Sequence, residues 1–489
     1  MPPLFAGFLV FYTSAAVLVL EILAGRVLAP YVGQSLETFT GIIGTVLAGI
    51  ALGSWYGGRV ADRVDPRQLL GPMVLGGGAI TLFTLPLVRL FGAGMQGGGV
   101  AAILILSVVG FFAPAAVLSA VNPTVVKLQL ASLAETGQTV GRYSALSTVG
   151  ALVGTFVTGF VLVAALPSQP IILAVGGSLV ALGVGLWLRL RPARVGSPTA
   201  MLAVAAVAGA LTLAVQSPCD LESAYFCARV ETDPANASGR ILMLDTLRHS
   251  YVDLDDPAHL EFSYTQMLAD ALGTLEPGQP LDTLHIGGGG FSMPRYLAAT
   301  RPGGDNLVLE LDPTLLQISR DELGLETGDG LRVDVGDARL SLARQPARRW
   351  DAVIGDAFGG LAVPWHLTTA EFVEEIQATL RPDGLYLINV IDYDELGFAR
   401  AEAATLAAVF EHVAVMAEPD HFAPGDERGG NHVMVASDAP IDLAGIERSI
   451  ADRGGAEVVL SGAELDAWIG DAQVLTDDFA PVDQLLTPA

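Results

Sequence analysis

The sequence predicts a protein in two parts, an α-helical membrane domain followed by an acidic α/β domain of the doubly wound, Rossmann-like kind. Two observations lead to this prediction: hydrophobic residues make up 51% of the 489 residues and charged residues only 16%, and the charges are divided unevenly. Residues 1–216 hold ten Lys and Arg side chains and five Asp and Glu side chains, whereas the remainder holds 16 and 47. The apolar composition excludes a disordered chain, and the acidic part should repel nucleic acid and attract cations.

Seven apolar segments in residues 1–216 are candidates for membrane spans, because a helix needs about 20 apolar residues to cross a bilayer. The first segment lacks the short apolar core and the cleavage site of a removable signal peptide, so we expect it to remain in the protein. The seven segments are Leu4–Leu23, Phe39–Trp55, Leu69–Leu90, Val100–Val121, Ala145–Leu166, Ile171–Leu190 and Ala200–Val215.

The basic residues of the loops predict the orientation of these spans. Cytoplasmic loops carry most of the Lys and Arg residues, and in this chain the basic loops lie between spans 2 and 3, 4 and 5, and 6 and 7. With seven spans, the acidic domain would lie outside the cell membrane, and a miscount by one span would reverse this result. The residues concerned are Arg59, Arg63, Arg67, Lys127, Arg142, Arg189, Arg191 and Arg194.

The chain has two cysteines, Cys219 and Cys227, just after the last apolar segment. They are either two buried reduced thiols or a disulfide, and a disulfide would indicate an oxidising compartment. Glu21 is the one carboxylate within an expected span, where a charge is unfavourable unless it has a partner or faces a cavity. Pairing with Arg26 and a functional role are both open for this residue.

The acidic half begins with a small β region and continues as alternating strands and helices. Residues 217–276 contain ARVETD, GRILMLD and SYVDLDD, which alternate in the β fashion, and then the helical FSYTQMLADAL. In residues 277–489 helical stretches separate several of the strands LDTLHI, DNLVLELD, LRVDVGDA, WDAVIGDAF, DGLYLINVID and NHVMVAS. This alternation predicts a parallel sheet that binds its ligand at the carboxyl ends of the strands.

A glycine run follows the first strand of residues 277–489. Because Gly287, Gly288 and Gly289 lack a Cβ, their backbone amides can approach a nucleoside or a carboxylate closely, although the run could also be an ordinary tight turn. Glu310 comes about twenty residues later at the end of the next strand, where a carboxylate can accept both hydroxyls of a ribose. The glycine spacing does not match GxGxxG, so no pyrophosphate is expected.

The next two strands also end in an acid, Asp337 and Asp356. Three acids at successive strand ends, opposite a glycine run, indicate a site for a cationic adenosine derivative. Asp337 would then bind the adenine amino group. Asp356 would lie nearest the reacting centre, where a carboxylate can neutralise a sulfonium or accept a proton from an amine.

The ordered motifs of the acidic half resemble those of the polyamine aminopropyltransferases, the spermidine and spermine synthase family. Over roughly residues 222–389, ILMLDTLRHS resembles the family's LDG strand, EFSYTQM its EFSYxEM block and IGGGG its IGGGDG loop. With its membrane half, the whole chain resembles the membrane-fused branch of that family.

This resemblance implies a methyltransferase-type fold and a set of site residues. Asp356 would deprotonate the attacking amine, Tyr264 would belong to the amine site, and Asp477 near the end could cap a helix or reach that site. The residues implied to bind the nucleoside are Gly287, Gly288, Gly289, Glu310, Asp312, Asp337 and Ala338. The residues considered as further substrate contacts are His249, Gln266 and Trp365.

The implied activity is aminopropyl transfer from decarboxylated S-adenosylmethionine to an amine, with release of methylthioadenosine and without a metal. The chain departs from the family mainly on the amine side. DAFGG at residues 356–360 replaces DSSDP, Gly290 replaces an Asp, His249 a Gln and Gln266 a Glu. Because these changes remove negative charge, tight binding of a diamine is doubtful.

Two rival functions follow from these departures. One is an enzyme acting on S-adenosylmethionine itself, by methyl transfer or by intramolecular cleavage to methylthioadenosine. The other is a non-enzymatic receptor or transporter of a nucleoside or polyamine. In each case the expected partners are a small sulfonium nucleoside, an amine in some reactions, and the lipid bilayer; a homo-oligomer is compatible with the sequence.

Overall fold

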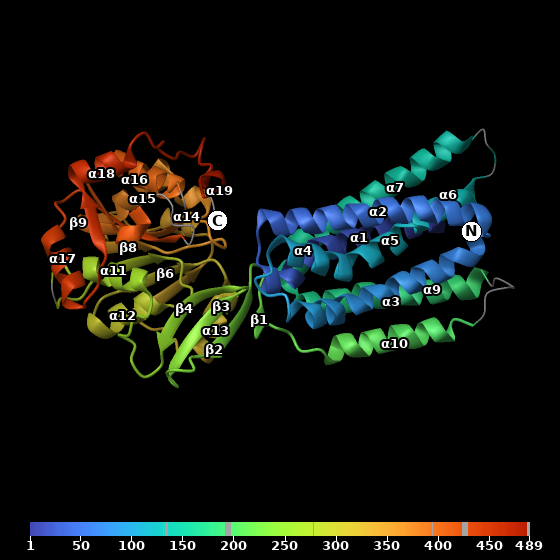
Figure 1. Cartoon of the computed structure of the whole chain (residues 1–489), viewed down its shortest axis with the longest axis horizontal. Coiled ribbons are helices and arrows are strands. Elements are labelled where there is room, and N and C mark those ends of the chain that lie inside the picture. Colours follow the sequence, from blue (N-terminus) through green and yellow to red (C-terminus); the bar gives the residue numbers. More distant parts are fainter. Residues whose placement is uncertain are drawn as a thin grey trace. The chain divides into compact units, whose positions relative to one another are not determined.

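The computed structural model describes residues 1–130, 132, 135–190, 197–276, 278–393, 395–422 and 429–486. The chain separates into two compact units, shown in Figure 1. We call the first the helical unit (Met1–Arg229 with Met243–Leu247) and the second the α/β unit (Val230–Leu242 with Arg248–Ala489). The helical unit thus continues past residue 216, and the predicted division into ranges 1–216, 217–276 and 277–489 stays a prediction.

Six helical segments in the described part of the chain are long and apolar enough to cross a membrane, which is compatible with a membrane protein. The seventh predicted span falls on α10 (Thr199–Ala214), which has 16 residues and is shorter than the roughly 20 that a span needs. The count of seven therefore stays a prediction. The six are α1 (Pro3–Val32), α2 (Leu36–Arg63), α3 (Pro66–Gly92), Gly99–Gln129, Thr136–Ala165 and α9 (Ser168–Leu190).

Two of these six segments are built from several consecutive elements. A short π-helical turn interrupts each of them. Gly99–Gln129 consists of α4 (Gly99–Ser107), η1 (Val108–Phe112), α5 (Ala113–Ser119) and α6 (Val121–Gln129). Thr136–Ala165 consists of α7 (Thr136–Val157), η3 (Thr158–Leu162) and α8 (Val163–Ala165).

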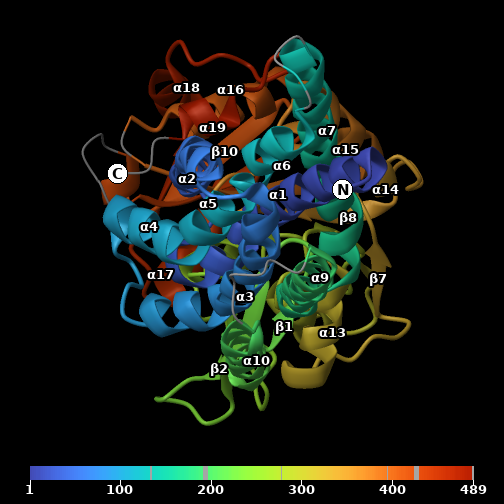
Figure 2. The ribbon, with the colours of Figure 1, turned by 90° about the vertical axis from the view of Figure 1, so that its right-hand side faces the viewer.

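Glycines spaced four residues apart let α2 pack closely against α5. A Cβ on Gly53 would lie 2.0 Å from the carbonyl oxygen of Ala116, and one on Gly57 would lie 2.5 Å from the Cβ of Ala120. Small residues at this spacing are typical of helix pairs in membranes, where close backbone approach supplies most of the attraction. Figure 2 shows α2 next to α5.

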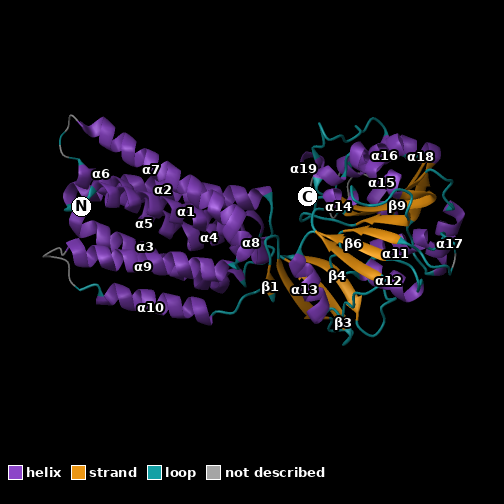
Figure 3. Cartoon of the chain, turned by 180° about the vertical axis from the view of Figure 1, so that it is seen from behind, coloured by secondary structure: helices purple, strands orange, loops and turns teal. Residues whose placement is uncertain are grey.

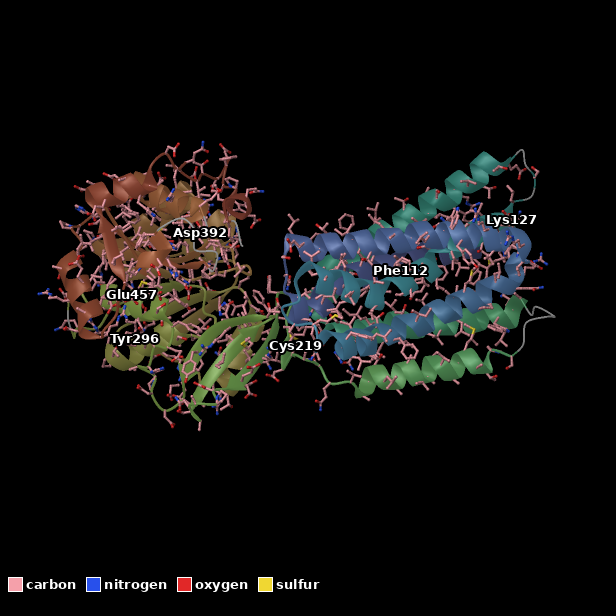
Figure 4. The ribbon with its side chains drawn as sticks, in the orientation of Figure 1. Phe112, Lys127, Cys219, Tyr296, Asp392 and Glu457 are labelled. Carbon is pink, nitrogen blue, oxygen red and sulfur yellow. A yellow bond between two sulfur atoms is a disulfide. The ribbon has the colours of Figure 1, made fainter. Side chains whose placement is uncertain are left out.

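Lys127 and Cys219 lie at opposite ends of the helical unit, as Figure 4 shows, and each end has an ion pair. At one end Lys127 pairs with Asp62 at 2.7 Å. At the other end Arg26 pairs with Glu222 at 3.0 Å, with both side chains nearly buried. Arg26 therefore has Glu222 as its partner, and no pairing with Glu21 is recorded among the described residues.

The disulfide alternative for the two cysteines is the one that the structure contains. Cys219 and Cys227 are bonded, with their Cα atoms 5.2 Å apart. The bond joins a residue two positions before β1 to the first residue of β2, in a four-stranded sheet in which neighbours along the chain are neighbours in space. The strands are β1 (Leu221–Glu222), β2 (Cys227–Thr232), β3 (Gly239–Leu244) and β4 (Leu247–Asp253); the last three were predicted.

An eight-stranded sheet in the order β12-β10-β11-β9-β8-β5-β6-β7 forms the centre of the α/β unit. The Rossmann-like prediction is confirmed, but the fully parallel sheet is wrong: β5 to β9 are parallel, whereas β11, β10 and β12 pair antiparallel. The strands are β5 (Thr283–Ile286), β6 (Asn306–Glu310), β7 (Leu331–Val335), β8 (Trp350–Gly355), β9 (Leu380–Asp392), β10 (His412–Ala417), β11 (Gly430–Ser437) and β12 (Val458–Ser461).

The directions of the strands were not predicted, nor were the strands β10 and β12, and each omission has a physical reason. A strand buried on both faces is an apolar run that looks the same in either direction, and six consecutive residues of β11 are buried. β10 directly follows the apolar end of a helix, so no change of period marks its start. β12 has only four residues, which is too short for a clear pattern.

Helices cover both faces of this sheet, as Figure 3 shows. Along β8, Val353 packs into the core on one face while Ala352 and Ile354 pack into the core on the other. The helices are α11 (Ser263–Leu272), α12 (Ser292–Thr300), α13 (Pro313–Glu322), α14 (Ala338–Leu342), α15 (Ala370–Thr379), α16 (Gly397–Val409), α17 (Leu443–Asp452), α18 (Gly462–Ile469) and α19 (Val482–Leu485), with the 3-10 turns η4 (Trp365–Leu367) and η5 (Pro419–Phe422).

Candidate active site

The glycine run after β5 lies directly against the end of β8. Gly287 has a φ of +92°, and a Cβ there would lie 2.4 Å from the carbonyl oxygen of Asp356. Both facts require glycine, since any side chain would be strained and would clash. The amide of Asp356 in turn donates to the carbonyl of Ile286 at 2.9 Å. The parallel pairing of β5 and β8 thus brings the glycine loop beside Asp356.

Glu310, at the end of β6, holds the shape of this glycine loop. Its Oε2 accepts hydrogen bonds from the amides of Gly288 at 2.7 Å and Gly289 at 3.3 Å, and its Oε1 accepts from the amide of Asp312 at 2.8 Å. Burial raises the pKa of Glu310, and the three amides oppose that rise. A carboxylate has about four acceptor positions, so about one remains while these bonds persist. Contact with both ribose hydroxyls stays a prediction.

Asp356 is held by two side chains that come from distant parts of the chain. Its Oδ2 accepts from the hydroxyl of Tyr264 at 3.1 Å and its Oδ1 from the amide of Asn389 at 3.0 Å. Burial raises the pKa of Asp356 to about 6, against the opposing effect of these two donors. The Asp356 carboxyl is therefore ionised at neutral pH, and its raised pKa makes it basic enough to take up a proton.

The structure thus brings together Asp356 and Tyr264, as the sequence predicts, and adds Asn389. Asn389 is 1% exposed and interrupts the apolar run of β9. A buried amide needs a hydrogen-bonding partner, and this polar residue within DGLYLINVID was the signal that the sequence reasoning missed.

His249 lies against the glycine loop. A Cβ on Gly289 would lie 2.8 Å from its Cε1 atom, and its Nδ1 is 3.1 Å from the hydroxyl of Ser250. Burial lowers the pKa of His249 to about 4, so the ring is neutral at neutral pH. It can form hydrogen bonds at the loop but adds no positive charge, and its contact with a substrate stays a prediction.

The two other predicted nucleoside acids cap helices. Asp312 caps α13 by accepting from the amide of Thr314 at 2.9 Å, and its second oxygen is buried with no protein partner in the described residues. Asp337 caps α14, which begins at Ala338, by accepting from the amide of Leu340 at 2.9 Å. Leu311, next to Glu310 in the chain, is 47% exposed.

Gln266 and Asp477 have partners outside the Asp356 cluster. Gln266 donates to the carbonyl of Leu260 at 2.8 Å and accepts from Arg453 at 3.2 Å. It follows Tyr264 by two positions, which is about 200° around a helix, so the two side chains diverge. Asp477 pairs with Arg339 at 2.7 Å.

Trp365, in η4, is 51% exposed and meets the ring of His366 edge to face. Its contact with a substrate stays a prediction. Among the described residues, no group of three or more His, Cys, Asp and Glu side chains is arranged to hold a metal ion.

Comparison with known proteins shows which family the chain resembles. No protein-family model matches the chain. It is 27% identical over 250 residues to the polyamine aminopropyltransferase of Vibrio vulnificus (strain CMCP6), covering 48% of this chain and 79% of that protein. It is 30% identical over 143 residues to the polyamine aminopropyltransferase of Chromobacterium violaceum, covering 29% of this chain and 53% of that protein. The chain is thus similar to the polyamine aminopropyltransferases, the spermidine synthase family.

These similarities support the resemblance seen in the motifs and indicate an aminopropyltransferase-like enzyme. Among solved structures, the chain is similar to a probable spermidine synthase from Corynebacterium glutamicum ATCC 13032. The two are 29% identical, the match covers 52% of this chain and 94% of that one, and the TM-score is 0.48.

Proposed function

We propose that the α/β unit transfers an aminopropyl group from decarboxylated S-adenosylmethionine to an amine and releases methylthioadenosine. The observation that carries this proposal is the position of Asp356. Its carboxylate lies at the end of β8, beside the glycine loop that Glu310 holds, and is oriented by Tyr264 and Asn389. A nucleoside on the loop would place its sulfonium close to a group that can accept a proton.

For this reaction the protein needs mainly to align the amine with the methylene carbon and to remove a proton from the amine. The nitrogen lone pair of the amine forms a bond to the methylene carbon, and the carbon–sulfur bond breaks with its electron pair going to sulfur. The sulfonium thereby becomes the neutral thioether of methylthioadenosine, and the proton lost by the amine passes to Asp356 and then to solvent. A pKa of about 6 lets Asp356 accept this proton and release it again near neutral pH.

We propose that the site recognises a single amine group of the acceptor, near Asp356, and does not bind a second one. In DAFGG the position of the family's second acid is Gly359, whose amide donates to the carbonyl of Ala362 at 2.8 Å in a tight turn. The Gln266 amide is occupied by Leu260 and Arg453. A second ammonium group would therefore lack a carboxylate from either position.

We further propose that the helical unit crosses the cell membrane and that the α/β unit lies outside it. Support comes from the helical unit alone. The basic residues of the α2–α3 loop and Lys127 belong to one end, and the Cys219–Cys227 disulfide belongs to the other. α10 returns to that second end, where the side chain of Gln169 donates to the carbonyl of Thr212 at 2.9 Å. Because α10 ends at the end opposite the basic loops, this arrangement favours an odd number of membrane crossings.

The donor and acceptor can be tested by incubating the purified full chain with decarboxylated S-adenosylmethionine or S-adenosylmethionine, with and without amines, and identifying the products by mass spectrometry. Methylthioadenosine formed from the decarboxylated donor only when an amine is present supports the proposal. Its release from S-adenosylmethionine alone would instead assign the intramolecular route. Nucleoside binding without any turnover would assign a receptor.

The location has its own test, which does not depend on activity. Reporter fusions after Arg189 and after Glu231 should lie on opposite sides of the membrane. The same side for both would contradict an external α/β unit.

A further inference from the structure

A second asparagine extends the contacts of Asp356 across the sheet. The amide nitrogen of Asn431, on β11, donates to the side-chain oxygen of Asn389 at 2.9 Å, and the amide nitrogen of Asn389 donates to Asp356 at 3.0 Å. In the antiparallel pairing of β9 with β11, Asn389 stands opposite Val433 and Asn431 stands opposite Ile391. The two asparagines are therefore diagonal neighbours on one face of the sheet, where long side chains can meet.

The direction of these two hydrogen bonds follows from chemistry. An ionised carboxylate only accepts hydrogen bonds, so Asn389 must turn its NH2 group toward Asp356. Its oxygen then points the other way and, because Asn389 is 1% exposed, water cannot readily satisfy it. Asn431 supplies the donor that this buried oxygen needs. Without that donor, the orientation of the Asn389 amide that serves Asp356 would leave its buried oxygen without a hydrogen bond.

We infer that Asn431 is a positioning residue, which acts on Asp356 through Asn389 by fixing which end of the Asn389 amide faces the carboxylate. The inference deepens the proposed function and rests on it insofar as it concerns turnover. Within the described part of the chain, the side chains that donate to Asp356 are those of Tyr264 and Asn389, and Asn431 need not touch the substrate. Its effect should therefore be on the protonation of Asp356 and not on the binding of the nucleoside.

The protonation of Asp356 can report on the orientation of Asn389, because few other described groups face this carboxylate. From α11 the titratable Tyr264 faces it, from β9 the neutral Asn389, and from the β5 side the backbone at Gly287. Beyond the glycine loop lie His249, which burial keeps neutral at neutral pH by lowering its pKa to about 4, and Glu310. Apart from burial, the two hydrogen-bond donors are what set the pKa of Asp356.

The test compares Asn431→Leu and Asn431→Asp with the unchanged full chain in detergent. Infrared difference spectra over a pH titration follow the C=O band of protonated Asp356, which is assigned by its loss in Asp356→Asn. Loss of a hydrogen bond to the charged form raises a pKa. We expect the midpoint to move up by about one pH unit in Asn431→Leu and further in Asn431→Asp, which places an acceptor where a donor is needed. The affinity for methylthioadenosine should change by less than about twofold.

Ser437→Ala is the matched control. Ser437 lies at the other end of β11, is 1% exposed and donates to the carbonyl of Gly384 at 2.9 Å, so its loss removes a buried hydrogen bond from the same strand. Its Asp356 midpoint should stay in place. An unchanged midpoint in both Asn431 variants, or an equal shift in Ser437→Ala, would overturn the inference.

Turnover gives a second readout. In the Asn431 variants kcat should fall with the acid limb of its pH profile displaced upward, while KM for the nucleoside donor is kept. If the unchanged chain shows no turnover with any donor, the proposed function fails, but the infrared titration still decides whether Asn431 positions Asn389. If Asn431→Leu does not fold, the isosteric Asn431→Asp carries the test.

Discussion

Two carboxylates at the same edge of the sheet, Glu310 and Asp356, are held in different ways. Glu310 accepts from three backbone amides, all within 22 residues of it in the chain. Asp356 accepts from two side chains, 92 and 33 residues away. Backbone amides follow from the fold itself, whereas side-chain donors can be changed one residue at a time. The nucleoside side is thus a product of the fold, and the reacting side is tuned by individual residues.

The largest expected difference between the two acids is in turnover. Asp356→Asn should lower turnover by roughly 10²–10⁴-fold, because it removes the proton acceptor, and should leave nucleoside affinity within about twofold. Methylthioadenosine release and calorimetric binding measure the two effects. The control is Asp351→Asn at the start of the same strand, where the side chain pairs with Arg381 and turnover should persist. Turnover that survives Asp356→Asn would remove the distinction.

Glu310→Gln should show the opposite pattern, with binding affected more directly than chemistry. The new NH2 group would face backbone amides that also donate, so the glycine loop should lose its shape. Affinity for methylthioadenosine should fall by roughly 10–100-fold. Calorimetric titration measures this loss. An unchanged affinity would mean that Glu310 does not support the nucleoside.

The pH dependence of turnover should follow the protonation of Asp356. Because the pKa of Asp356 is raised to about 6, the carboxylate is ionised above that pH and protonated below it, so turnover should decline below about pH 6. Tyr264→Phe removes a donor to the ionised form and should move this decline upward by about one pH unit. Initial rates across the pH range give the profile. A limb that stays in place in Tyr264→Phe would show that Tyr264 does not tune Asp356.

The smallest effect is expected at Gln266, which lies on the same helix as Tyr264 but contacts Leu260 and Arg453. Gln266→Ala should lower the free energy of unfolding by about 1 kcal/mol through the lost hydrogen bonds. Turnover should change by less than about twofold. Thermal unfolding and product release measure the two effects. A large loss of turnover with intact stability would return Gln266 to the amine site.

The structural features that depend on a local sequence pattern were predictable from the sequence. Alternation and apolar runs predicted β5 to β9 and β11, and the glycine run and strand-end acids predicted the edge where Asp356, Glu310 and Asp337 lie. Strand direction was not predictable, because a strand buried on both faces carries no sign of its direction. β10 was missed for another reason, because it closely follows the apolar end of α16 and no change of period marks its start.

The site was predictable only where its residues follow the fold. The assignment of Tyr264 to the amine site came from the family resemblance and not from any spacing in the chain. Asn389 and Asn431 meet across 42 residues, and no periodic pattern encodes such a contact. The helical spacing of Tyr264 and Gln266, in contrast, could have shown that both cannot face one pocket.

The most direct test of the account is a density map of the full chain with methylthioadenosine bound. We expect the ribose at the glycine loop beside Glu310 and the thioether sulfur directed toward Asp356. A nucleoside bound elsewhere, or one whose sulfur points away from Asp356, would contradict the central claim that this carboxylate adjoins the bond that breaks.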